Sequence, residues 1–140
     1  MGHLEPNMPD DVKSRLESYS LIQRKKLLEM RALIFAASAE LKPQITLVET
    51  LKWTQLAFLP AKPRTGTTIR LDVVEGNLIA FFHCQTTLVD TFRQLYPQEF
   101  CFEGNRALIV PINQPIPTEA LKHCFGLALT YHSAQRRKML

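Results

Sequence analysis

One cysteine stands where a thiol can be activated, directly before an expected helix. Cys84 lies in the run HCQTT, and Thr87 is a good N-cap residue for the helix that follows. Backbone N–H groups and the helix dipole at such a place stabilise a thiolate or bind an anion. Cys84 is therefore a reactive thiol, part of an anion-binding turn, or a small buried hydrophobic residue. The side chains assigned to this candidate site are those of His83, Gln85, Thr86, Thr87 and Arg70.

A tryptophan and a charged pair are the other candidates. Lys52 and Trp53 fall in an expected strand, so their side chains face opposite ways. On an uncovered sheet face, Trp53 would stack on a planar ligand or on a partner's side chain; alternatively it packs under helices. Glu103 and Arg106 are expected opposite each other across a turn, as part of a polar site or as an ordinary surface ion pair.

Composition and motifs exclude several classes of protein. The 140 residues are 46% hydrophobic and 21% charged, as in soluble globular domains, and no apolar run reaches the roughly 20 residues of a membrane span. No apolar segment marks a secretory signal, so the expected compartment is the cytoplasm. The three cysteines form no paired spacing, and no zinc motif, nucleophile elbow or glycine-rich phosphate loop occurs. We therefore expect no bound metal and no cofactor.

The net charge of +4 permits anionic partners without requiring them. Basic residues cluster at 24–26 and 136–138, which we interpret as a solvated helix face and a frayed tail. Nucleic acid is therefore not the expected partner, although binding through these clusters would show a steep salt dependence.

Helical patterns open and close the chain. A short helix is expected from Pro9 to about Tyr19, and Ser20 with Gln23 resembles a capping box for a longer helix that ends before Pro43. Its buried stripe leaves Arg31 outside and comprises Leu27, Met30, Ile34, Ala37 and Leu41. Further helices are expected over 87–95, with Thr87 and Asp90 as caps, and over 117–132.

Strand patterns occupy the middle of the chain. One strand is expected within 47–54, followed by a loop over 59–66. A hairpin joins 67–74 to 78–84 through a type II′ turn at Gly76-Asn77, and the same Glu-Gly-Asn tripeptide recurs at 103–105. These elements predict an α+β two-layer sandwich, with N-terminal helices and a C-terminal helix on an antiparallel sheet of about five strands. Residues 1–8 are expected to be disordered, 9–133 to form one domain, and 134–140 to form a basic tail.

Five segments together resemble the YdhG-like family, also called domain of unknown function 1801. They are ETLKW at 49–53, GTTIR at 66–70, HCQTTLV at 83–89, FEGNRAL at 102–108 and the prolines at 115–117. The resemblance covers about residues 10–132 and implies the fold more than an activity. One branch of the family is linked to iron handling by similarity to frataxin. That chemistry needs many carboxylates, and residues 6–28 contain only Asp10, Asp11 and Glu17.

The leading functional hypothesis is a non-enzymatic binding module. It would hold a small anionic or planar ligand, or a partner protein, on the open sheet face near Trp53, Arg70 and His83, as a monomer or a homodimer. The alternatives are a frataxin-like, iron-handling protein and a thiol-dependent enzyme or redox sensor that uses Cys84.

Overall fold

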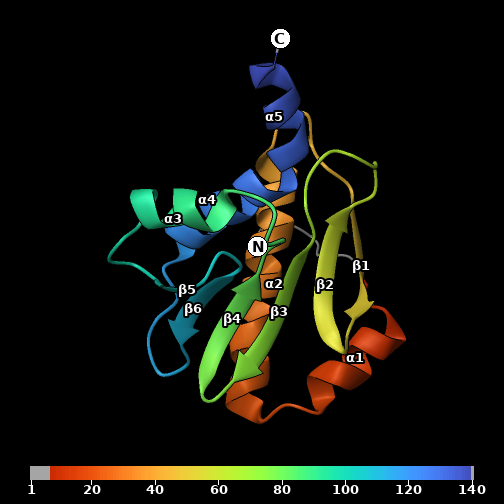
Figure 1. The fold of residues 1–140 in the computed structure, drawn as a ribbon. Helices are drawn as coiled ribbons and strands as arrows, with labels where there is room; N and C mark the ends of the chain where they lie inside the picture. Colours follow the sequence, from red (N-terminus) through yellow and green to blue (C-terminus); the bar gives the residue numbers. More distant parts are fainter. Residues whose placement is uncertain (1–6, 140) are drawn as a thin grey trace.

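The computed structural model describes residues 7–139 (Figure 1). The helices are α1 (Asp10–Glu17), α2 (Leu21–Glu40), α3 (Leu88–Leu95), α4 (Thr118–Leu129) and α5 (Tyr131–Lys138). The strands are β1 (Leu47–Lys52), β2 (Gln55–Pro60), β3 (Ile69–Val74), β4 (Asn77–Phe81), β5 (Cys101–Glu103) and β6 (Ala107–Pro111). The disorder predicted for residues 1–8 falls mostly outside the described residues; Met8, which is described, packs against the core.

The strands form one antiparallel sheet in the order β1-β2-β3-β4-β6-β5. Helix α2 packs against β3, β4 and α4, while α1 packs against β1. Figure 1 shows α2 behind the strands and draws no helix in front of β3 and β4. The predicted α+β class is confirmed, with six strands where about five are expected.

Helix α2 begins as its sequence predicts. The backbone N–H of Gln23 donates to Ser20 Oγ (3.3 Å), and the backbone N–H of Ser20 donates to Gln23 Oε1 (3.1 Å). This capping box satisfies N–H groups that have no partner within the helix. The buried stripe of α2 contains Leu27, Met30, Ile34 and Ala37, as predicted. Leu41, the fifth residue predicted for this stripe, instead follows the end of the helix and is half-buried.

The prediction that Arg31 lies outside this stripe is wrong. The stripe is wider on the side that faces β1, and the Arg31 side chain is only 3% exposed. Its Nε and Nη2 donate to the two carboxylate oxygens of Glu49 at 2.6 and 2.9 Å. The Glu49 side chain, on the core face of β1, is 5% exposed. A buried guanidinium is stable here because this bidentate carboxylate compensates its lost hydration.

The segment predicted as one strand within 47–54 is the first half of a hairpin. Strands β1 and β2 pair from Leu47 opposite Pro60 to Lys52 opposite Gln55. The turn is Trp53-Thr54, whose φ angles are 55° and 62°. Neither residue is a glycine or an asparagine, the types that favour a two-residue turn of this kind, so the residue types do not predict this turn. Part of the expected loop 59–66 is therefore strand.

The two other hairpin turns also differ from prediction. Residues 75–76, with φ angles of 50° and 76°, form the β3–β4 turn, one position before the predicted one. Positive φ at both residues marks a type I′ turn, whose twist matches that of the strands. The turn between β5 and β6 has three residues, so Glu103 lies opposite Ala107 and not opposite Arg106. The predicted Glu103–Arg106 cross-strand pair is therefore wrong.

Helix termini give two further corrections. Helix α3 follows Thr87 as predicted, but the Thr87 side chain makes no capping bond. Thr86 Oγ1 instead accepts from the backbone N–H of Leu88 (3.4 Å), and Asp90 pairs with Arg93 (3.0 Å). The basic tail, which we expect to fray, forms α5 because the chain bends at Thr130 and starts a new helix.

Candidate functional site

The open sheet face carries part of the predicted site. The register places Arg70, Phe81, Ala107 and Glu103 in one row across four neighbouring strands. Three strand spacings separate Arg70 from Glu103, about 14 Å. The two charged side chains therefore belong to the same face without being neighbours, and they do not form one polar cluster.

The turn at 83–87 lies against the turn between β5 and β6. Asn105 Nδ2 donates to the Cys84 carbonyl (2.9 Å), and the backbone N–H of Phe82 donates to the Arg106 carbonyl (2.7 Å). The His83 ring is used locally, because its Nδ1 accepts from the backbone N–H of Gln85 (3.1 Å). The structure therefore groups this turn with Arg106, and His83 does not serve Cys84 as a base.

The donors expected to hold an anion at this turn have protein acceptors. The backbone N–H of Thr87 donates to the Tyr131 hydroxyl (3.2 Å), and that of Leu88 to Thr86 Oγ1. A helix N-terminus binds an anion through such N–H groups when they are free. Cys84 itself is half-buried. Among the described residues, this turn is therefore a poorer anion site than its sequence suggests.

Trp53 lies at the opposite end of the sheet. It occupies the tip of the β1–β2 hairpin and is 83% exposed, so neither predicted location, on the open face or under the helices, is correct. Arg15 of α1 holds the tip by donating from Nε to the Thr54 carbonyl (2.7 Å). Lys52 ends β1 next to it and is also exposed. The predicted grouping of Trp53 with His83 is therefore wrong.

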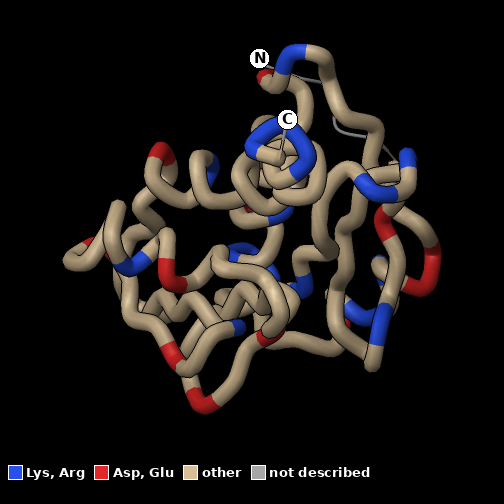
Figure 2. Tube along the Cα trace, turned by 45° about the horizontal axis from the view of Figure 1, so that its top comes forward, with Lys and Arg blue, Asp and Glu red and all other residues tan. Residues whose placement is uncertain are grey.

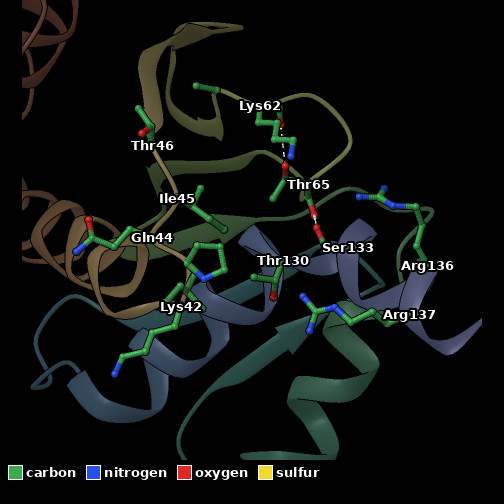
Figure 3. A pocket seen from close by; sticks show the side chains of 13 residues that line it. Lys42, Gln44, Ile45, Thr46, Lys62, Thr65, Thr130, Ser133, Arg136 and Arg137 are labelled. Atoms are coloured by element: carbon green, nitrogen blue, oxygen red, sulfur yellow. Dashed lines mark hydrogen bonds between the residues drawn. The ribbon is translucent and has the colours of Figure 1, made fainter.

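Helix α5 projects at one end of the molecule (Figure 1). A cleft of about 650 Å³ lies there (Figure 3). Three segments far apart in sequence contribute to its lining: residues 41–46 after α2, residues 61, 62 and 65 after β2, and residues 130, 133, 136 and 137 at the start and along α5. We call it the basic cleft, because its lining contains four cationic side chains and, among the described residues, no carboxylate. The four are Lys42, Lys62, Arg136 and Arg137.

Hydrogen bonds between the loop after β2 and the helices hold the walls of the basic cleft in place. The backbone N–H of Ser133 donates to the Thr65 carbonyl (3.0 Å), and that of Thr67 to the Ala128 carbonyl (2.9 Å). Arg136 Nη1 donates to the Arg64 carbonyl. Arg136 is thus partly used in the wall, whereas the described residues include no carboxylate paired with Lys42, Lys62 or Arg137.

Sequence reasoning misses the basic cleft. The cluster at 136–138 is visible in the sequence and is interpreted there as a tail, but nothing local indicates that it faces residues 42 and 62. Figure 2 shows the basic positions of the last helix near the C-terminus. A helical continuation after Thr130 is the only sequence signal that could have indicated this site.

Residues 7–139 offer little support for a metal site, a reactive buried thiol or a membrane span. These residues contain no group of three or more His, Cys, Asp or Glu side chains that could hold a metal ion. Burial raises the pKa of the Cys124 thiol to about 12, so this cysteine stays protonated in the core. None of the described helices has the length and apolarity that a bilayer span requires.

The fold has a counterpart among solved structures. A crystal structure of a DUF1801-family protein, YdhG from Bacillus subtilis, superposes with a TM-score of 0.63 over 84% of this chain and 87% of that one. This chain has the fold of that YdhG protein. The two sequences are 17% identical, so the likeness concerns the fold alone. A scan against models of protein families gave no match, and neither did a search of curated proteins. The likeness to YdhG lends no support to a frataxin-like relation.

Proposed function

We propose that this protein is a non-enzymatic binding module that holds a small anionic ligand in the basic cleft. The supporting observation is the concentration of four cations in one concave site whose described lining contains no acid. Its volume of about 650 Å³ is in the range of small-molecule sites. Cations without a carboxylate partner repel one another, and a bound anion relieves this repulsion.

Charge reversal at two of these cations tests the proposal. Lys62→Glu/Arg137→Glu should weaken pyrophosphate binding by at least about tenfold, because each hydrogen bond to a charged group contributes roughly 1.5–3 kcal/mol. Isothermal titration calorimetry gives the affinity, and amide chemical shifts locate the site. The matched control is Lys13→Glu/Lys25→Glu, which changes the same net charge at two exposed residues outside the cleft.

Two results would contradict this proposal. One is equal loss of affinity in both double variants, which would indicate a general effect of net charge. The other is a set of shifts confined to residues 83–87 and 103–106, which would return the site to the turn predicted from sequence. The iron-handling and thiol alternatives stay predictions; ferrous iron titration and alkylation of Cys84 at neutral pH test them.

A second candidate function, contact with a partner protein, is favoured by the tip of the β1–β2 hairpin. Trp53 presents an indole that is 83% exposed, on a backbone held by Arg15 and kept in the left-handed region at two successive residues. Such strain is retained where surrounding structure or function requires it. Tryptophan is also enriched among the residues that contribute most to the binding energy of protein interfaces.

The strain at this tip gives a stability prediction. Trp53→Asn/Thr54→Gly should raise the free energy of unfolding by about 1–2 kcal/mol, because asparagine and glycine adopt positive φ at low cost. Urea denaturation followed by circular dichroism measures it. Arg15 donates to a backbone carbonyl and so keeps its bond in the variant. A loss of stability would instead show that the indole contributes to the fold, and the partner-contact candidate would lose its support.

A further inference from the structure

We propose that the ligand of the basic cleft is a phosphorylated polyol such as a sugar phosphate, with hydroxyl donors beside its anionic group. This inference rests on the proposed function, since it names the class of ligand for the same site. It comes from the hydroxyl groups that line the cleft together with the cations. Three of them belong to Thr65, Thr130 and Ser133.

Each of these hydroxyls donates its proton to a backbone carbonyl. Thr65 Oγ1 donates to the carbonyl of Lys62 (2.9 Å), Thr130 Oγ1 to that of Gly126 (2.9 Å), and Ser133 Oγ to that of Thr65 (3.2 Å). The direction is certain, because a carbonyl oxygen can only accept. The Thr65 carbonyl also accepts from the backbone N–H of Ser133, so both its lone pairs are occupied.

A hydroxyl has one proton and two lone pairs, so while these bonds to the carbonyls are kept the three groups can only accept hydrogen bonds from a ligand. A fully ionised phosphate or carboxylate also only accepts, and it finds no donor among them. It binds instead to the ammonium and guanidinium groups. In Figure 3 the Arg137 guanidinium points toward Thr130, which places donors of positive charge beside acceptor hydroxyls. The cationic side chains therefore select an anionic group, and the acceptor hydroxyls select hydroxyl donors on the same ligand.

The apolar residues of the lining favour a ligand that also has an apolar surface. Leu41, Pro43, Ile45 and Ala61 supply apolar surface in the same cleft. The C–H face of a sugar ring can lie against such surface while its hydroxyls donate to the acceptors. An alkyl phosphate has the charge and the apolar body but leaves the three hydroxyls, which belong to half-buried residues, without a donor. Removing water from a hydroxyl oxygen without supplying another donor to its lone pairs weakens binding.

A comparison of three phosphates tests this inference. Ribose 5-phosphate, n-pentyl phosphate and inorganic phosphate are titrated calorimetrically into the full chain. We expect ribose 5-phosphate to bind at least tenfold more tightly than pentyl phosphate, which has the same number of carbons and the same charged group. Comparable affinities, within threefold, would overturn the polyol class and leave the anion-binding proposal intact. No binding of any of the three would overturn the anion-binding proposal itself, and this inference with it.

Two variants locate the effect. Thr130→Val and Thr65→Val each remove one acceptor while keeping the shape of the side chain, so a folding defect in one leaves the other as a test. Each substitution should lower the affinity for ribose 5-phosphate by about three- to tenfold and leave the affinity for pentyl phosphate unchanged. The control is Thr91→Val on α3, which loses the same kind of bond, from Oγ1 to the Thr87 carbonyl (3.0 Å), away from the cleft. Equal weakening of both ligands by the two cleft variants would overturn the inference.

Discussion

Arg31→Met is expected to lower the free energy of unfolding by about 3–5 kcal/mol, the range for breaking a buried ion pair from one side. The substitution leaves the Glu49 carboxylate 5% exposed and without the two hydrogen bonds, at 2.6 and 2.9 Å, that now compensate its burial. It also removes the guanidinium from the Phe35 ring, whose centroid lies 4.9 Å from Arg31 Cζ. Urea denaturation at neutral pH gives the free energy.

The double variant Arg31→Met/Glu49→Leu provides the control. It removes both charges and fills similar volume with apolar atoms, so it should recover much of the stability lost in Arg31→Met. A loss below about 1 kcal/mol in Arg31→Met would show that water reaches Glu49 in solution. The pairing of α2 with β1 would then contribute far less to stability than its burial indicates.

Gly66→Ala is expected to destabilise the protein by about 3 kcal/mol or more, at the upper end of overpacking effects. A Cβ at this position would lie 2.1 Å from the Leu129 carbonyl oxygen and 2.6 Å from that of Ala128. Both are backbone atoms at the end of α4, so a side-chain rotation cannot relieve the clash. Because Thr67 donates to the Ala128 carbonyl, the variant should also displace a wall of the basic cleft and weaken pyrophosphate binding.

Gly126→Ala is the matched control, the same substitution within α4. The nearest atom to its Cβ would be Leu41 Cδ2 at 3.9 Å, an ordinary contact. Since alanine is the better helix former by roughly 0.5–1 kcal/mol, this variant should be slightly stabilised. Thermal unfolding of the two variants side by side measures both effects. A Gly66→Ala protein as stable as the parent would mean that the loop and α4 separate easily.

Sequence patterns predict those parts of the fold that depend on neighbours along the chain. The capping box of Ser20 and Gln23, four buried positions of α2 and the position of α3 follow from residue type and spacing, and the structure confirms them. The β1–β2 turn escapes prediction because Trp53 and Thr54 carry no turn signal. Arg31 is misplaced because helical spacing cannot reveal an acid on a strand 18 residues later.

The candidate site depends even more than the fold on contacts between residues far apart in the sequence. Cys84 and its turn attract attention as sequence, yet Tyr131 and Thr86 occupy the N–H groups that an anion would need. The cations of the basic cleft come from residues 42, 62, 136 and 137, which no motif connects. Their common location depends on the contact of the loop at 61–67 with the α4–α5 bend.

The sequence by itself determined the α+β class, the order of four helices and two of the three hairpins, and the lack of common catalytic motifs, because these depend on local periodicity and residue type. The tertiary structure alone decided which charges meet. Arg31 joins Glu49 in the core, Trp53 stands alone on a hairpin tip, and four cations surround one cleft. Packing of distant segments creates these environments, and the strength of a charge or a hydrogen bond depends on the environment rather than on the residue alone.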